Sequence, residues 1–372
     1  MAKDRTEKRA RRRRSGFVSV VNGLLTLLVL GLLAGVGIFL YGASQFYAAG
    51  TVKADTNFTV ERGSSLQTIA QRLEEQGLVA NHWIFWAGTR ALKKDSDIKA
   101  GVYVLKANAS MSDVLKEITE GKPLDFFVNV IPGDTSWQVA EKLNQAGPNL
   151  TGEPVQPPAE GTLLAIRYDF FPGDSRRSVL DKMQAEMTAR LQAIWGGRDK
   201  AIDAVIKSPA ELVTLASIVE KETGIETERP QVAAVFINRL KKNMRLQTDP
   251  TVLYGVTNGK TVLSRGPTSA ELKQKTPYNT YQVDGLPPGP IANPGEDALK
   301  AVAHPAASND LYFVAKSANP ADGHLFAATY AQHRKNVSAY RKAAAEANAE
   351  DAREALEEEA AKAAGETVET PQ

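Results

Sequence analysis

The chain has 372 residues, 43% of them hydrophobic and 24% charged, a composition typical of a folded protein and not of a wholly disordered one. It contains no cysteine, which excludes disulfides, thiol nucleophiles and cysteine-bound metal ions. Its four histidines lie far apart in the sequence without metal-ligand spacing, so we expect no metal and no cofactor. The length allows a membrane segment and two domains of ordinary size.

The N-terminal region combines a basic tail with an uncharged stretch. Residues 1–17 form the basic tail, and no charged residue lies between Arg14 and Lys53. Residues 18–41 are almost wholly apolar, and about 20 such residues in a helix cross the hydrocarbon core of a bilayer. We therefore predict a transmembrane helix over residues 18–41. Because basic residues beside a span stay in the cytoplasm, the rest of the chain is expected outside the cytoplasmic membrane.

Two other interpretations of this region have less support. A cleavable signal peptide usually has an apolar core of only ~7–15 residues, although small residues that would suit cleavage follow at 42–44 and 48–50. A run of arginines also occurs in nucleic-acid-binding tails. Its position directly before an apolar span favours membrane topology, so we expect no nucleic-acid partner.

Residues 56–122 are predicted to form a small module of strands and helices. Strands are expected at 58–60 and 101–105, and helices at 66–76, from residue 83 and at 111–118. The opening strand, turn and helix carry the pattern V-x-x-G-x-S, which resembles LysM-type glycan-binding modules. A spacer domain without a ligand is the alternative.

Residues 123–340 are predicted to form a second domain that mixes helices and short strands. We expect a buried strand at 126–131, an exposed loop at 146–162, and strands at 311–314 and 324–326. Helices are expected at 137–145 and 178–195, from a capping box at 208–211, at 228–243 and from residue 330. The predicted fold class is therefore α+β. Residues 341–372 are rich in Ala and Glu, which predicts a frayed helix or a disordered tail.

Two glutamates near the end of the helix that begins after Ser208 are candidates for acid–base chemistry. The centre of the buried face is expected at 212, 215, 216 and 219, with Glu220 at one margin and Glu222 at the other. A carboxyl whose pKa is raised by burial can donate a proton at neutral pH. Helix geometry does not distinguish the two residues. The alternative is a structural ion pair with nearby basic residues, namely Lys221, Arg229, Arg239 or Arg245.

Polar and aromatic residues that follow these glutamates suit a sugar site. Pyranose faces stack on aromatic rings, and sugar hydroxyls need fixed hydrogen-bonding groups. The candidate binding residues are Asn238, Gln247, Thr248, Asp249, Tyr254, Tyr278, Asn279 and Tyr281.

Three segments together resemble the YceG-like family of endolytic murein transglycosylases, over about residues 56–340. They are residues 215–255, TPYNTY at 276–281 and GLPPGPIANPG at 285–295. The family cleaves peptidoglycan glycan strands between N-acetylmuramic acid (MurNAc) and N-acetylglucosamine (GlcNAc), leaving a 1,6-anhydro end. The resemblance implies that Glu220, in SIVEKET, is the catalytic residue and that Glu222 supports the structure around it.

The resemblance also implies a location and partners. We expect a single-pass protein of the cytoplasmic (inner) membrane, with its N-terminus in the cytoplasm and its catalytic domain in the periplasm. Peptidoglycan strands are the expected substrate, the membrane the expected support, and peptidoglycan synthases the expected neighbours. Acting close to them, the enzyme would limit the length of nascent strands.

One segment departs from the family pattern, and two other functions remain open. Where family members commonly read EG-x-LFPDTY, this chain has EGTLLAIRY at 160–168, so glycan contacts there are expected to differ. A peptidoglycan hydrolase would need a second carboxylate, for which Asp249 or Glu222 is available. A glycan-binding scaffold without catalytic activity is the other alternative.

Overall fold

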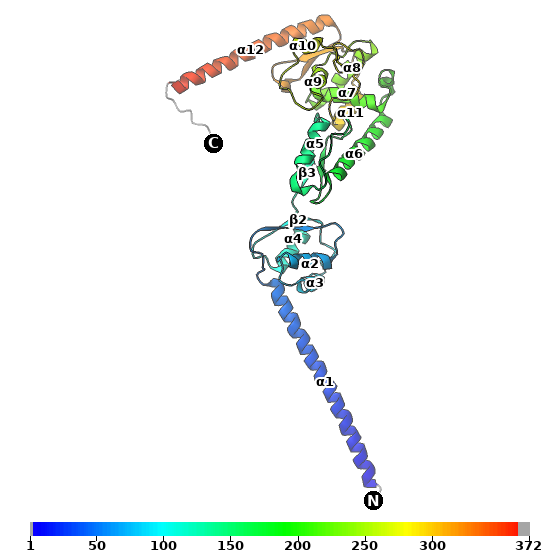
Figure 1. Ribbon diagram of the computed structural model, residues 1–372, viewed down its shortest axis with the longest axis vertical. Coiled ribbons are helices and arrows are strands. Elements are labelled where there is room, and N and C mark those ends of the chain that lie inside the picture. Colours follow the sequence, from blue (N-terminus) through cyan, green and yellow to red (C-terminus); the bar gives the residue numbers. More distant parts are fainter. Residues whose placement is uncertain (1–2, 364–372) are drawn as a thin grey trace. The chain divides into compact units, whose positions relative to one another are not determined.

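The computed structural model describes residues 3–363 and divides the chain into two compact units, Met1–Asp125 and Phe126–Gln372. Both units combine helices with antiparallel strand pairs, which confirms the mixed α+β class (Figure 1). The LysM-like nature of the module at 56–122, and the other predicted domain boundaries, stay predictions.

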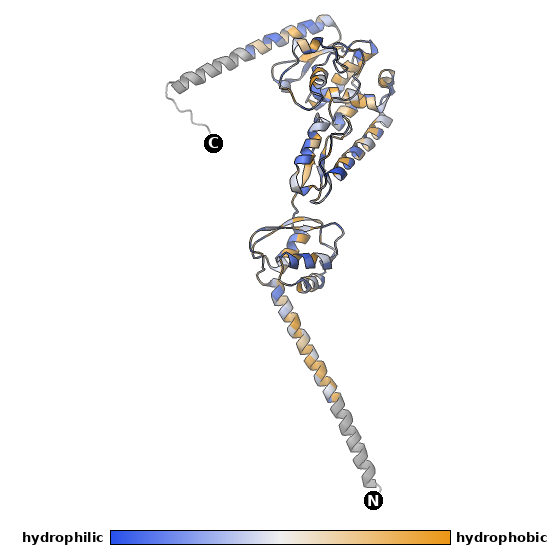
Figure 2. Cartoon of the chain, viewed as in Figure 1, coloured by the Kyte–Doolittle hydropathy of each residue, from blue (hydrophilic) through white to orange (hydrophobic). Residues whose placement is uncertain are grey.

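The first unit begins with a long apolar helix. Its elements are α1 (Lys3–Tyr47), β1 (Thr56–Val60), α2 (Leu66–Glu75), α3 (His82–Ala91), β2 (Gly101–Leu105) and α4 (Met111–Glu120). Within α1, residues Val21–Tyr47 are long and apolar enough to cross a membrane (Figure 2). Most of their side chains are exposed. This is compatible with the predicted span, although the helix continues beyond residue 41.

The rest of the first unit folds around one small core. β1 pairs with β2 in antiparallel register, with Thr56 opposite Leu105. The helices close over this pair because their apolar residues recur on one face, as at Ile69, Ala70 and Leu73 of α2. The strands predicted at 58–60 and 101–105 are confirmed, as are the three helices.

The second unit carries most of the helices. Its first half comprises β3 (Phe127–Asn129), α5 (Ser136–Gln145), β4 (Arg167–Asp169), α6 (Arg176–Gly197) and α7 (Pro209–Glu222). Its second half comprises α8 (Arg229–Lys241), α9 (Asp249–Thr257), α10 (Ser269–Lys273), α11 (Glu296–Ala303), β5 (Tyr312–Ala315), β6 (His324–Ala327) and α12 (Tyr330–Ala363). Short 3-10 helices occur at Gly147–Asn149, Lys200–Ala204, Glu226–Glu228 and Pro320–Asp322.

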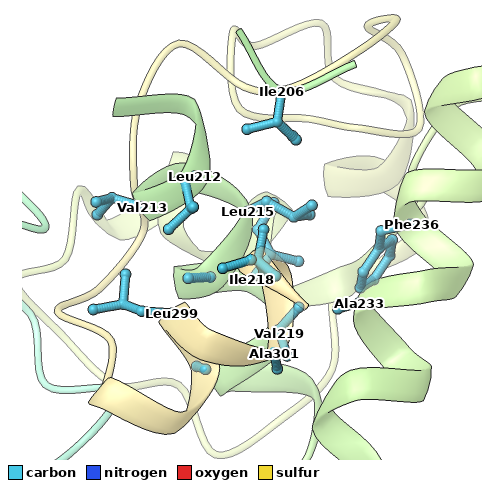
Figure 3. Close-up of a cluster of buried hydrophobic side chains, with 14 of the residues drawn as sticks. Ile206, Leu212, Val213, Leu215, Ile218, Val219, Ala233, Phe236, Leu299 and Ala301 are labelled. Carbon is cyan, nitrogen blue, oxygen red and sulfur yellow. The ribbon is translucent and has the colours of Figure 1, made fainter. Parts of the chain in front are cut away.

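Helix α7 is the centre of the second unit's core. It contacts α6, α8, α9 and α11, and its eight residues 212–219 are all buried (Figure 3). The prediction of one buried face was therefore too narrow, because neighbouring helices cover α7 on every side. Both glutamates follow this buried run, in the last turn of the helix.

The predictions named no element at β4, α9, α10 or α11, and three further details differ. The strand expected at 126–131 is shorter and buried on one face only, since Phe127 is 47% exposed and Ile131 is 52% exposed. At the start of α7, the hydroxyl of the capping residue Ser208 accepts from the Glu211 N–H. The Glu211 carboxylate, however, accepts from the main-chain N–H of Lys207 and not from that of Ser208, so only half of the predicted capping box is present. The loop at 146–162 is not wholly exposed, because Leu150 and Gly161 are buried.

The C-terminal elements follow the predictions. β5 and β6 form the expected hairpin, with Tyr312 opposite Ala327. α12 begins at Tyr330 and continues as helix through Ala363, which is one of the two alternatives for the tail. Residues 364–372, also part of that prediction, lie outside the described residues.

The central place of α7 predicts a large cost for truncating its core. Leu215→Ala should lower the free energy of unfolding by about 2–5 kcal/mol, because it leaves a cavity in a fully buried site. Val262→Ala, at an apolar residue of the same unit that is 66% exposed, should have a much smaller effect. Denaturant unfolding followed by circular dichroism measures both, and equal effects would contradict the prediction.

Candidate active site

The carboxylate of Glu220 is almost completely buried at the C-terminal end of α7. Its side chain is 4% exposed, and its Oε1 accepts a hydrogen bond from Nη2 of Arg229 at 3.0 Å. Its Oε2 accepts from the backbone N–H of Gly295 at 2.9 Å. Gly295 caps the N-terminus of α11, where the helix dipole also favours a negative charge. An ion pair with Arg229, one of the predicted alternatives, is therefore present.

Arg229 has one further donor beside this ion pair. Its side chain is 12% exposed, and its Nε is buried without a hydrogen-bond partner among the described residues. Buried donors usually have partners, so this N–H is an unsatisfied group next to a buried carboxylate.

Two glycines let the main chain approach Glu220 closely. A Cβ placed on Gly295 would lie 3.1 Å from Oε2 of Glu220 and 3.2 Å from Cγ of Pro132. Gly133 has a φ of +89°, which glycine adopts most readily, and a Cβ there would lie 3.3 Å from the Lys221 side chain. The two loops that carry these glycines therefore pack directly against the end of α7.

Asn293 joins three segments around this position. Its fully buried side chain accepts from the N–H of Leu163 at 3.0 Å and donates to the carbonyl of Asp134 at 3.1 Å. Its main-chain carbonyl accepts from the N–H of Gly133 at 3.0 Å. One amide side chain thus fixes the loops at 133–136, 160–163 and 291–295 to each other.

Glu160 is a second buried carboxyl. The sequence analysis named it only as the first residue of the segment at 160–168, which differs from the family pattern. Its Oε1 accepts from the Ser136 N–H at 2.7 Å and from Asn293 Nδ2 at 3.3 Å, and its Oε2 accepts from the Tyr254 hydroxyl at 3.3 Å. Burial raises the pKa of Glu160, against the opposing effect of these hydrogen bonds. The sequence did hold a signal, because Glu160 is the one charged residue between Glu153 and Arg167.

Glu222 is hydrogen-bonded to the loop that follows α8. Its carboxyl accepts from the hydroxyl of Thr248, and burial raises the pKa of Glu222, which the nearby charge of Asp249 raises further. Thr248 in turn donates its N–H to the hydroxyl of Thr280 at 3.0 Å. The contacts of Glu222 are therefore those of a residue that holds a loop in place.

Comparison with known proteins places this chain in a family. Residues 58–339 match the YceG-like family, which covers most of the chain. This chain belongs to the YceG-like family. All of the contacts of Glu160, Glu220 and Glu222 described above fall within the matched range, whereas α1 lies before it.

Named relatives of this YceG-like chain include two curated proteins. It is 31% identical over 336 residues to the endolytic murein transglycosylase of Bacillus subtilis strain 168, covering 82% of this chain and 90% of that protein. It is 28% identical over 337 residues to the endolytic murein transglycosylase of Streptococcus pneumoniae strain D39, covering 78% of this chain and 60% of that longer protein. The crystal structure of a putative YceG-like protein from Listeria monocytogenes is 28% identical with a TM-score of 0.46, covering 76% of this chain and 98% of that one.

The predicted binding residues of this YceG-like chain lie in different environments. The ring of Tyr254 lies against that of Tyr278, with centroids 4.8 Å apart, and its hydroxyl reaches Glu160. The Tyr281 hydroxyl donates to the exposed Asp249 at 2.6 Å. Gln247 is exposed, and its main-chain N–H pairs with the carbonyl of Thr280.

Two of the predicted residues are already engaged by main-chain carbonyls. The amide of Asn238 donates to Ser308 and Asp310, at 2.8 and 3.1 Å, and holds the segment before β5. The buried amide of Asn279 donates to the carbonyl of Gln274 at 2.6 Å. A role in substrate binding stays a prediction for both.

Among the residues that the structure describes, no three His, Asp or Glu side chains come together in a way that would hold a metal ion.

The buried carboxyl of Glu160 predicts a specific pH dependence of stability. Above about pH 4.5, the ordinary value for Glu, the unfolded chain loses this proton while the folded chain retains it, so the free energy of unfolding falls as pH rises. Glu160→Gln cannot ionise, and the variant should therefore gain stability relative to the parent over that range. Thermal unfolding midpoints from about pH 4 to about pH 8 measure the difference, and a constant difference would disagree with this account.

Proposed function

We propose that this protein is an endolytic lytic transglycosylase that cleaves the MurNAc–GlcNAc bond of peptidoglycan strands and leaves a 1,6-anhydro-MurNAc end. Curated relatives that match most of the chain are named endolytic murein transglycosylases. The observation that carries the proposal is the position of Glu220, held on rigid α7 between the Arg229 guanidinium and the Gly295 N–H.

In the proposed reaction a single carboxyl group serves both steps. Glu220 in its protonated form donates a proton to the glycosidic oxygen as the bond from that oxygen to C1 of MurNAc breaks. The C6 hydroxyl of the same sugar then attacks C1 and returns its proton to Glu220. Attack from within one sugar gains from proximity and needs no positioned water.

The surroundings of Glu220 support the charged form that it takes between the two steps. Between the steps Glu220 is a carboxylate, and the donors from Arg229 and Gly295 stabilise that charge in a site with little water. Glu160 and Tyr254 then act by holding the adjacent loops, together with Asn293.

A two-carboxylate hydrolase is the second candidate function. The observation that favours it is the burial of the Glu160 carboxyl. Burial keeps Glu160 protonated to a higher pH than an ordinary glutamate, which suits a general acid. A hydrolase with Glu160 as acid would use Glu220 as its base, activate water and leave reducing ends. The two functions therefore differ in the chemistry of their products.

We also propose that α1 crosses the cytoplasmic membrane with the N-terminus inside. The rest of the chain then lies in the periplasm and acts on nascent strands near their synthases. The apolar helix Val21–Tyr47 supports a single anchor, and the basic residues before it support this orientation. An enzyme tethered in this way would limit strand length. Strand lengths that did not change on deletion of the gene would contradict that role.

Glu220→Gln should lower the rate of glycan cleavage by about 10²–10⁴-fold, the usual contribution of a general acid. Glu186→Gln on the exposed surface of α6 is the matched control and should cleave like the parent. Mass spectrometry of digested, peptide-free glycans identifies the ends. Reducing ends would support the hydrolase, and a parent protein that cleaves no glycan would support the non-catalytic scaffold. A Glu220→Gln variant as active as the parent would refute the catalytic role of Glu220.

Gly295→Ala tests whether the close approach of the main chain positions Glu220. The added Cβ would lie 3.1 Å from Oε2 of Glu220 and should push the carboxylate away by a few tenths of an ångström. We expect cleavage to fall by about tenfold or more, because small displacements of a catalytic group are costly. Gly224→Ala is the control, since a Cβ there meets no atom within 4 Å. Equal activity of the two variants would refute this positioning role.

A further inference from the structure

The outer side of α3 presents an apolar surface beside α1. Trp83, Ala87, Ala91 and Leu92 are exposed, and we call these four residues the α3 apolar face. Trp83, Ala87 and Ala91 follow each other at intervals of one helical turn, so they form a continuous stripe. A water-exposed tryptophan and leucine, 57% and 46% exposed, are unfavourable unless another apolar surface covers them.

An open groove of about 620 Å³ separates this face from α1. Its lining contains only apolar side chains, glycines and aromatic rings, among them Ile38, Phe39 and Tyr47 of α1 and Trp83, Ile84 and Leu92 of α3. The groove contains no charged side chain, and its α1 wall belongs to the apolar stretch Val21–Tyr47. Whatever fills it is therefore apolar and also contacts α1.

The height of α3 along α1 is fixed by close packing. Phe46 of α1 is 3% exposed and belongs to the core of the first unit. A Cβ on Gly88 would lie 2.5 Å from the ring of Phe46, so α3 approaches α1 as closely as glycine allows. The last turns of α1 are therefore part of the folded module, and α3 cannot move freely along the helix.

Helix length places this contact at the membrane surface. The apolar stretch Val21–Tyr47 has 27 residues and is about 40 Å long, whereas the hydrocarbon core needs only about 20 residues. If the stretch enters the core at its N-terminal end, residues after about 41 lie among the lipid headgroups. The groove is lined by α1 residues from Gly35 onward, so it opens at the outer leaflet.

We propose that the α3 apolar face inserts into the outer leaflet of the membrane that α1 spans, and that lipid acyl chains fill the groove. This proposal rests on the membrane anchoring proposed above. The exposed rings of Tyr47 and Trp83 lie where such residues favour the interface. Arg90 lies over the ring of Trp86, 5.1 Å from its centroid, and remains exposed to headgroups. The first unit is then held flat against the bilayer, as amphipathic interfacial helices are.

Spin labels on single cysteines test this insertion, because the chain has no cysteine of its own. The labels are placed at Ala87→Cys and Ala91→Cys on the face, at Leu30→Cys within α1, and at the exposed Gln71→Cys of α2. The full chain is reconstituted in vesicles of phosphatidylcholine and phosphatidylglycerol. Power saturation then compares the access of oxygen, which concentrates in lipid, with that of a water-soluble nickel chelate.

We expect the ratio of oxygen to nickel access at positions 30, 87 and 91 to exceed that at position 71 severalfold. A lipid-exposed position 30 with water-exposed positions 87 and 91 would overturn the insertion of α3 and leave the anchor intact. A water-exposed position 30 would overturn both proposals. Trp83→Glu, combined with the label at 91, should shift that label toward water, and an unchanged ratio would also count against insertion.

Discussion

Burial of a carboxylate is the constraint around which the second unit is organised. Helix α7 is enclosed by other helices, so a charged group at its end is tolerated only where hydrogen-bond donors replace water. Arg229, at the start of α8, supplies one donor, and the Gly295 amide at the start of α11 supplies the other. Because both helices pack against α7, the core that stabilises the fold also sets the geometry of Glu220.

The loops around α7 depend on that arrangement. Asn293 ties the loops at 133–136 and 160–163 to the segment before α11, and it does so with a single buried side chain. Glu160 then becomes buried, which raises its pKa and brings it to the hydroxyl of Tyr254. A site built from loops thus gains the rigidity of the helices that anchor them. This rigidity is what a one-carboxyl mechanism needs, since the same group must serve two proton transfers.

In the first unit, the important constraint is how the folded module is joined to α1. A folded module on a single apolar helix has no fixed height above a bilayer unless the helix and module share a core. Phe46 provides that shared core, and Gly88 allows the close approach of α3. The apolar surfaces of α3 and α1 then line one groove, which is the physical basis for treating them as one lipid-facing surface.

The sequence by itself determined the local features of this protein. Apolar periodicity and capping residues located several helices but not α9, α10 or α11, and an uncharged run located α1. The family motifs predicted Glu220 as the catalytic residue. The sequence did not determine which partner Glu220 takes, that α7 is buried on all sides, or that Glu160 lies at the site. Those features depend on contacts between residues far apart in the sequence. Gly295 and Glu220 are separated by 75 positions, and Asn293 and Asp134 by 159 positions. Helix and strand periods report only on near neighbours along the chain, so tertiary packing alone decided them.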